Sequence, residues 1–184
     1  MGRLDSRAAF LGAWSSACAS NAAATILVPS GSYLLTRVVF SGQCKNSVTF
    51  QIDGTLVAPT DYGTENWITF DGVSGVTILG GTLDGQGAGL WACKNAGKTC
   101  PIGATVGVAT VFNIGSLGKD PNEQGVQNVT VKTAVFSGTQ NGVRIKTWAK
   151  PNQGFVRGVL FEDVTINNAQ NPVLIDQEYC PDIN

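Results

Sequence analysis

Gln140-Asn141-Gly142-Val143-Arg144-Ile145-Lys146 is followed thirty residues later by Gln170-Asn171-Pro172-Val173-Leu174-Ile175-Asp176. The Gln-Asn pairs stand in the same register, and each leads into a strand-like apolar run. Each of these units also begins with an apolar strand, Val126–Val131 in the first and Val159–Phe161 in the second. A period of roughly 20 to 50 residues that is built from strands without helices is typical of a solenoid.

The chain before this repeat has the same strand rhythm from Thr25 onward. Short runs rich in Val, Ile and Thr alternate with turn residues, and three of them end in Asp-Gly, at Asp53-Gly54, Asp71-Gly72 and Asp84-Gly85. Asp-Gly predicts a turn, because glycine accepts positive φ and Asp bonds to nearby backbone. An antiparallel β-sandwich also uses many short strands. Tight Asn-Gly hairpin loops are few here, however, which favours an all-β parallel β-helix.

One segment, residues 5–20, has the pattern of a helix. Asp5 or Ser6 can cap it, and Phe10, Leu11, Trp14 and Cys18 fall on one face at three- and four-residue steps. A helix that precedes a stack of strands is suited to cover one open end of its core. We therefore predict a single domain, 1–184, with a capping helix and β-coils over residues 25–184.

The composition excludes several classes of protein. A formal net charge of −1 with 14% charged residues disfavours a nucleic-acid protein, and no apolar run is long enough for a membrane helix. The chain has no histidine and no Cys-x-x-Cys pair, so we predict no metal site and no cofactor.

The five cysteines favour a secreted protein. A disulfide between Cys93 and Cys100 would close a polar loop, and one between Cys18 and Cys44 would tie the helix to the strands. Cys180 is then left over. Asn128-Val129-Thr130 is an N-glycosylation sequon, which agrees with secretion. The N-terminus, Met1–Asp5, lacks the apolar core of a signal peptide, so we expect none within this chain.

Four stretches resemble the plant polygalacturonases, pectinases of the right-handed parallel β-helix class. They are Val76–Trp91 with Gly80-Gly-Thr-Leu-Asp-Gly-Gln-Gly, Ile114–Lys119, Gly142–Lys146, and Val173–Cys180, and they occur in the family's order. The resemblance implies a right-handed β-helix and an acidic polysaccharide, galacturonan, as the partner.

The departures from this family concern its catalytic motifs. An Asn-Thr-Asp triplet, an Asp-Asp pair and a Gly-His-Gly triplet are all absent where the resemblance would place them. The sequence instead passes through Ala109-Thr110-Val111-Phe112-Asn113 into the Ile114 motif. We predict an internal deletion with a seam near residues 105–113, and no catalytic residue among those that remain.

The resemblance assigns substrate binding to Arg144 and Lys146, and it places Tyr179 at a sugar subsite. Side chains two residues apart on a strand project to one face, so Arg144 and Lys146 should form an outward basic pair with Ile145 turned inward. Arginine offers a fork that matches a galacturonate carboxylate. Trp91 and Trp148 are further residues that could stack on sugar.

Carboxylates that could act as acid and base are few. Asp176 and Glu178 are two residues apart and should share a strand face, but the resemblance gives neither a catalytic role. The aspartates of the Asp-Gly pairs are better explained as turn residues.

These observations predict a polygalacturonase-like protein of the plant cell wall that keeps part of a galacturonate groove and hydrolyses little or nothing. One alternative is a protein-interaction or self-associating module, because an open coil end exposes unpaired backbone and apolar side chains. A second is an active hydrolase with relocated carboxylates.

Overall fold

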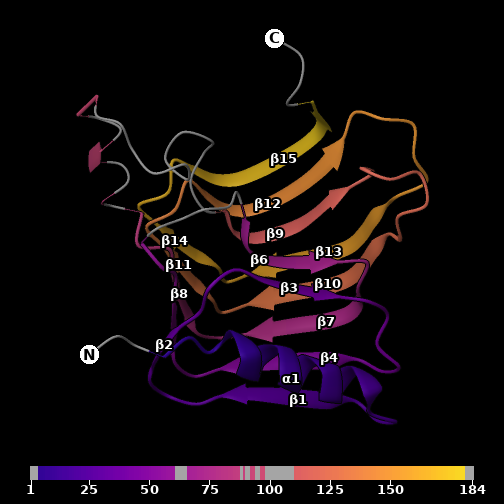
Figure 1. The fold of residues 1–184 in the computed structure, drawn as a ribbon, viewed down its shortest axis with the longest axis horizontal. Coiled ribbons are helices and arrows are strands. Elements are labelled where there is room, and N and C mark those ends of the chain that lie inside the picture. Colours follow the sequence, from indigo (N-terminus) through magenta and orange to yellow (C-terminus); the bar gives the residue numbers. More distant parts are fainter. Residues whose placement is uncertain are drawn as a thin grey trace.

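The computed structural model describes residues 4–60, 66–87, 89, 92–93, 96–97 and 110–180. Within these residues, one helix precedes fifteen strands, which form three five-stranded sheets (Figure 1). Successive strands pass from the first sheet to the second and the third, and then return to the first. The chain thus makes one coil for every three strands.

Within each sheet, neighbouring strands come from successive coils of the chain. The first sheet contains β1 (Ala24–Val28), β4 (Val48–Ile52), β7 (Ser74–Leu79), β10 (Val126–Lys132) and β13 (Val156–Glu162). The second contains β2 (Ser32–Leu34), β5 (Thr55–Val57), β8 (Thr82–Asp84), β11 (Val135–Ser137) and β14 (Thr165–Asn167). The third contains β3 (Val38–Ser41), β6 (Asn66–Asp71), β9 (Thr110–Leu117), β12 (Asn141–Trp148) and β15 (Asn171–Tyr179).

Every pairing between these strands is parallel. An antiparallel sandwich is therefore excluded, and the predicted parallel β-helix is confirmed. The repeat of Gln-Asn pairs has a structural reason. Asn141 and Asn171 occupy the same register position in β12 and β15, where Asn171 Nδ2 donates to Asn141 Oδ1 at 3.0 Å.

The predicted capping helix is α1 (Arg7–Ala19), which lies beside β1 at the N-terminal end of the stack (Figure 1). Phe10 and Trp14 are buried in the core, and Trp14 Nε1 donates to the Ser41 carbonyl at 3.2 Å. The Asp5 carboxylate rather than the Ser6 hydroxyl caps the helix, because Asp5 Oδ1 accepts the N–H of Arg7 at 3.0 Å.

Asp5 also ties the helix to the first coil, since Thr36 donates both its N–H and its hydroxyl to the same carboxylate. Burial acts to raise the pKa of Asp5, but the hydrogen bonds from Thr36 and Arg7 outweigh it and lower the pKa below its ordinary value.

The structure joins Cys18 at the end of α1 to Cys44 in the connection between β3 and β4. Cys93 is disulfide-bonded, and Cys100, its predicted partner, lies outside the described residues. Cys180 is a free, exposed thiol. No helix in the described part of the chain has the length and apolar character to cross a membrane.

Inward side chains stack from coil to coil. In the third sheet one such row contains Phe40, Phe70, Ile114, Ile145 and Ile175. A row of this kind buries apolar surface continuously, which is the main source of stability in a solenoid. The middle of the row is buried, since Ile114 is 0% exposed, whereas its last member is exposed to solvent, since Ile175 is 63% exposed.

The predicted seam, residues 105–113, runs into the start of β9, and its residues 105–109 are outside the described part. From Thr110 onward, β9 pairs with β6 so that Phe112 stands opposite Ile68 and Ile114 opposite Phe70. Phe112 is 1% exposed, and its ring centroid is 5.2 Å from that of Phe70. The inward register therefore continues from the coil before the seam into the coil after it.

The Asp-Gly turns depend on glycine for two different reasons. Gly72 has a φ of +58°, the left-handed conformation that the sequence predicts for all three. Gly54 and Gly85 do not adopt positive φ. They are instead sites of close approach, because a Cβ on Gly54 would lie 2.6 Å from the Pro29 carbonyl oxygen of the neighbouring coil. Stacking of coils, rather than backbone conformation, excludes larger residues there.

Phe112→Ala should lower the free energy of unfolding by about 3–5 kcal/mol, because the ring packs against Phe70, Phe136 and Phe161 and its loss leaves a cavity at the seam. Urea denaturation measures the change. Leu160→Ala is the matched control, since Leu160 is 48% exposed and its truncation should cost less than about 0.5 kcal/mol. Equal effects of the two substitutions would contradict the described register of β9.

Candidate functional site

The three residues that the sequence singles out for binding lie on the last two strands of the third sheet. In β12, Val143 and Ile145 pack toward the core, and Arg144 and Lys146 alternate with them on the opposite face. Ile145 stands between Ile114 and Ile175 in the inward row, as the spacing predicts. The two cations therefore project from one strand in the same direction.

Tyr179 reaches this face through an irregularity in β15. Lys146 of β12 pairs with Asp176 of β15, and the next pair is Trp148 with Tyr179. Between the two pairs, β12 advances by two residues and β15 by three. One strand thus has an extra residue, a β-bulge, which reverses the alternation beyond it. Without the bulge Tyr179 would face away from Lys146. With it, the Tyr179 ring lies against Trp148 at a centroid distance of 5.1 Å.

The three predicted residues converge. Lys146 Nζ lies 3.1 Å from the centroid of the Tyr179 ring, and Arg144 Cζ lies 5.6 Å from the same centroid. An ammonium held over a ring face is attracted by the negative face of the aromatic ring. We call Arg144, Lys146, Trp148, Asp176 and Tyr179 the basic–aromatic cluster.

The two cations differ in exposure, which the sequence does not predict. Lys146 is 1% exposed, so its ammonium is covered rather than open to solvent. The side chain of Arg144 is 11% exposed. Arg144 is therefore the cation of the cluster that can still meet a ligand, whereas Lys146 acts from beneath the Tyr179 ring.

Asp176 is the carboxylate of this cluster in the described part of the chain. Its Oδ2 atom lies 3.8 Å from Arg144 Nη2, a long ion pair without the geometry of a bidentate contact. β15 shifts register between Asp176 and Tyr179, within the stretch that contains Glu178, so the predicted shared face of Asp176 and Glu178 is not a face of regular strand. Glu178 instead lines an adjacent hollow.

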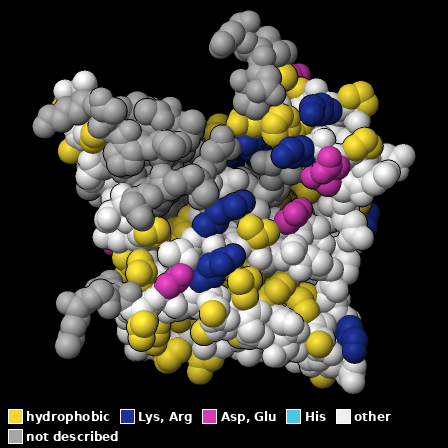
Figure 2. Space-filling view, viewed as in Figure 1, with side chains coloured by type: hydrophobic (Ala, Val, Ile, Leu, Met, Phe, Trp, Pro, Cys, Tyr) yellow, Lys and Arg dark blue, Asp and Glu magenta, His cyan; other side chains and the backbone are white. Residues whose placement is uncertain are grey.

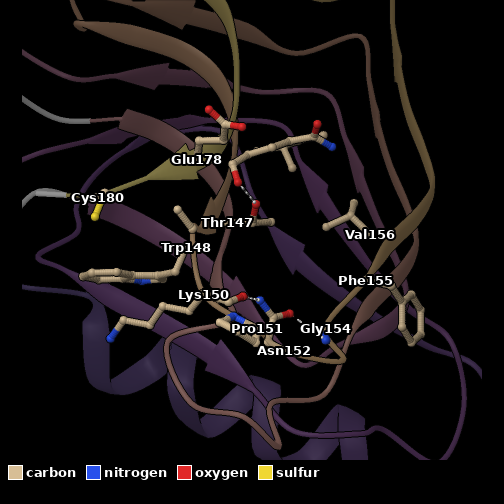
Figure 3. Close-up of a pocket in the computed structure, with 13 residues that line it drawn as sticks. Thr147, Trp148, Lys150, Pro151, Asn152, Gly154, Phe155, Val156, Glu178 and Cys180 are labelled. Carbon is tan, nitrogen blue, oxygen red and sulfur yellow. Dashed lines mark hydrogen bonds between the residues drawn. The ribbon is translucent and has the colours of Figure 1, made fainter.

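That hollow, which we call the loop hollow, has a volume of about 900 Å³ and lies between the end of β15 and the connection from β12 to β13 (Figure 3). Trp148, Lys150 and Glu178 are among its lining residues. Lys150 Nζ lies 5.0 Å from the centroid of the Trp148 ring. Trp148 thus belongs both to the basic–aromatic cluster and to the wall of the loop hollow.

A row of buried polar side chains leads to Arg144 from the neighbouring strands. Thr69, Asn113 and Arg144 stand in register across β6, β9 and β12, and Asn113 is 0% exposed. Thr69 Oγ1, Asn113 Oδ1 and Arg144 Nε have no hydrogen-bond partner among the residues that the structure describes. Sequence reasoning missed this row because Asn113 stands within the predicted seam, where no motif marks it.

Gly115 holds the backbone of the cluster in place. It has a φ of +106°, and β9 shifts register against β12 beside it. A Cβ on Gly115 would lie 2.3 Å from the Lys146 carbonyl oxygen. The absence of a side chain therefore allows β9 to approach the strand that carries both cations.

The other residues that the sequence singles out lie elsewhere or outside the described part. Asn128 of the sequon is exposed on β10, and Trp91 is outside the described residues. Asp84 behaves as a turn residue, since its Oδ1 accepts the N–H of Gln86 at 2.9 Å. Asp53 accepts a bond from the Gln51 side chain instead.

Asp71, the third aspartate of the Asp-Gly pairs, lies at the end of β6. Burial, together with the nearby charge of Glu123, raises the pKa of Asp71 above its ordinary value.

Comparison with known proteins agrees with this geometry. The model of the family described as glycosyl hydrolases family 28 matches residues 18–111 and 103–184. The chain belongs to glycosyl hydrolase family 28. Its match consists of two parts that meet at residues 103–111, directly before β9.

Several curated relatives of this family 28 protein are plant polygalacturonases. A polygalacturonase of Prunus persica is 40% identical over 276 residues, covering 98% of this chain and 70% of the relative. An exopolygalacturonase of Platanus acerifolia is 32% identical over 96% of this chain and 72% of the relative. A polygalacturonase of Gossypium barbadense is 28% identical over 98% of this chain and 68% of the relative.

The alignment with the Prunus persica polygalacturonase is longer than the chain itself. It spans 276 residues, whereas the whole chain has 184. Part of the Prunus persica sequence inside the aligned stretch therefore has no counterpart in this family 28 chain.

Gly115→Ala should lower the free energy of unfolding by about 2 kcal/mol or more, because a methyl group meets the Lys146 carbonyl oxygen and the left-handed backbone is strained with any side chain. Chemical denaturation measures this change.

Gly12→Ala is the matched control. Nothing lies within 4 Å of a Cβ on this helical glycine, so the same substitution should stabilise the protein by about 0.5–1 kcal/mol. A neutral effect of Gly115→Ala would show that β9 does not approach Lys146 as closely as described.

Proposed function

We propose that this family 28 protein binds galacturonan through the basic–aromatic cluster without hydrolysing it. The observation that carries the proposal is the composition of the cluster. Two cations and two aromatic rings gather on one face, and the carboxylate in contact with them, Asp176, is already paired with Arg144.

Hydrolysis of a glycosidic bond generally requires two carboxyl groups, one on each side of the bond. Asp176 alone cannot supply both groups. Glu178 lines the loop hollow, whereas Asp176 is not among the described lining residues of that hollow. The sequence contains no histidine that could replace either group.

An internal deletion accounts for the missing catalytic motifs. The two-part family match and the longer aligned stretch of the Prunus persica relative both support a loss near the seam. The coils that remain keep their inward register at β9, so such a loss is compatible with a packed core. We infer that the removed coils held the acidic motifs.

In this proposal the carboxylate of a galacturonate unit takes the place of Asp176 at the Arg144 fork. The 3.8 Å separation of Arg144 and Asp176 is a weak contact that a bidentate ligand can displace. Trp148 and Tyr179 then offer aromatic surface to the sugar ring, and Lys146 adds positive charge from below.

We place this binding in the plant cell wall. The plant polygalacturonase relatives, the Cys18–Cys44 disulfide and the exposed sequon at Asn128 all support a secreted protein.

Arg144→Ala should weaken binding to an oligogalacturonate at least about tenfold, because it removes the fork that meets the carboxylate. Isothermal titration calorimetry measures the loss. Arg37→Ala removes an exposed arginine between β2 and β3 and should leave binding unchanged. A reducing-sugar assay on polygalacturonate should show no turnover by the unmodified chain. Turnover that disappears in the Arg144→Ala variant would instead support a hydrolase with relocated carboxylates.

A second candidate function is self-association through the last coil. Val173 and Ile175 occupy inward positions of β15 but are 61% and 63% exposed. Hydrophobic side chains gather at this end of the molecule, where Figure 1 draws β15 (Figure 2). Exposed apolar side chains beside an unpaired strand edge favour association with a second copy.

If the last coil self-associates, light scattering after size-exclusion chromatography should give the mass of a dimer, and Ile175→Lys should return a monomer because its charge cannot be buried. Leu27→Lys is the control, since Leu27 is 58% exposed on β1 at the opposite end. A monomer at high concentration would count against this function and would leave the binding proposal intact.

A further inference from the structure

A second hollow, separate from the basic–aromatic cluster, lies at the corner between the third and first sheets. Its volume is about 480 Å³, within the usual range for a small-molecule site. Side-chain amides and one aromatic ring dominate its lining, and we call it the amide hollow: Gln43, Asn122, Gln124, Gln127, Gln153 and Phe155.

Three coils contribute to this hollow because their corners stack. Gln43 follows β3, Gln124 follows β9, and Gln153 follows β12. Gly72, which follows β6, lies beside the same corner, since a Cβ on it would be in ordinary contact with the Gln124 Cβ at 3.5 Å. Residues more than a hundred positions apart in the sequence therefore line one site.

Two of the amides are held in fixed orientations by the protein. Gln43 Nε2 donates to the Gly72 carbonyl, and Gln127 Oε1 accepts a 2.7 Å bond from Arg157 Nε. The oxygen of the Gln43 amide and the nitrogen of the Gln127 amide remain available to a ligand. No hydrogen bond within the described chain engages the side chains of Asn122, Gln124 or Gln153. The hollow thus offers both donors and acceptors, as a ligand rich in hydroxyl groups requires.

Phe155 supplies the apolar side of the hollow. It is 43% exposed, and it stands at the boundary between the amide hollow and the loop hollow. Its ring packs closely on Gly125, where a Cβ would lie 2.5 Å from Phe155 Cε1. Arg157 Cζ lies 4.9 Å from the ring centroid. The ring is therefore held in place and can serve as a platform for the C–H face of a sugar.

The charges around the amide hollow disfavour an acidic ligand. Arg157 is held against Gln127 and Phe155 at the rim. No Lys or Arg side chain is among the described lining residues themselves, whereas Glu123 is. Burial and, after it, the charge of Glu123 raise the pKa of Asp71, so this carboxyl lies close enough to Glu123 to feel its charge. Figure 2 shows basic and acidic side chains interspersed on the face of the molecule that it draws, without a large patch of one sign. The positive charge of Arg157 at the rim is countered by Glu123 within the hollow, so an acidic sugar gains little here, and a neutral sugar loses nothing.

A metal ion is a poorer fit than a sugar. No group of three or more acidic, histidine or cysteine side chains occurs among the described residues in a metal-binding arrangement. Glu123 is moreover engaged, since its Oε2 accepts the N–H of Lys119 at 3.0 Å.

We infer that the amide hollow is a binding site for a neutral sugar, with Phe155 as the stacking platform and Gln124 and Gln153 as hydrogen-bonding groups. The site is distinct from the basic–aromatic cluster in position and in charge. It does not depend on whether that cluster binds galacturonan.

The test is calorimetric titration of the full chain with a neutral galactose tetrasaccharide and, separately, with tetragalacturonate. The neutral probe should bind with little dependence on salt, because no ion pair forms. Phe155→Ala should weaken its binding at least about tenfold. Phe155→Tyr should retain binding because it keeps the ring, and Gln124→Ala should weaken it several-fold.

Matched variants separate the site from general effects on folding. Leu160→Ala removes another exposed apolar side chain, and Gln170→Ala another exposed amide, and both should bind the neutral probe normally. Arg144→Ala should also leave neutral binding unchanged, which distinguishes this site from the proposed galacturonan site.

Two results would overturn the inference. The first is no binding of the neutral probe at roughly 10 mM, and the second is unchanged neutral binding in Phe155→Ala. If that variant at the same time loses tetragalacturonate binding, the hollow serves the acidic ligand instead.

Discussion

The structure depends on one constraint, which is that each coil must lie directly on the preceding coil with its inward side chains in register. Parallel pairing fixes this register strand by strand, so that Phe70, Ile114 and Ile145 form a single apolar row. Because side chains alternate along a strand, the same register also fixes the outward face. The row of Thr69, Asn113 and Arg144 exists because the core beneath it is aligned. The register that packs the core thus also places Arg144, the proposed binding cation, on the outward face.

The cluster owes its shape to two departures from that register. The register of β9 shifts at Gly115, and the register of β15 shifts before Tyr179. The first shift lets the backbone of β9 meet the Lys146 carbonyl, and the second brings the Tyr179 ring onto the Lys146 ammonium. Regular strands would build the same core but would leave Arg144 and Lys146 without the Tyr179 ring. Irregularity in a sheet often marks a functional site for this reason.

The fold could be predicted from the sequence because its determinants are periodic. The repeat of Gln140-Asn141 at Gln170-Asn171 gives the coil length, and the alternation around Ile145 gives the faces of β12. Tyr179 could be found only through a family motif, because its orientation depends on a bulge that alternation does not predict. The same bulge falls in the stretch from Asp176 to Tyr179, so alternation alone cannot place the side chain of Glu178. The burial of Lys146 and the row through Asn113 depend on contacts between coils, which no local pattern encodes. The amide hollow is harder still, since Gln43, Gln124 and Gln153 meet only through the lengths of three separate corners.

The bulge in β15 has a consequence for how such a protein can change over generations. Gain or loss of one residue near the end of a strand turns the next side chain over, while the apolar row below stays where it was. Binding preference can therefore be altered by single-residue insertions at strand ends, without any change to the residues on which folding depends. A scaffold of stacked coils in this way separates the evolution of its ligand chemistry from the evolution of its stability.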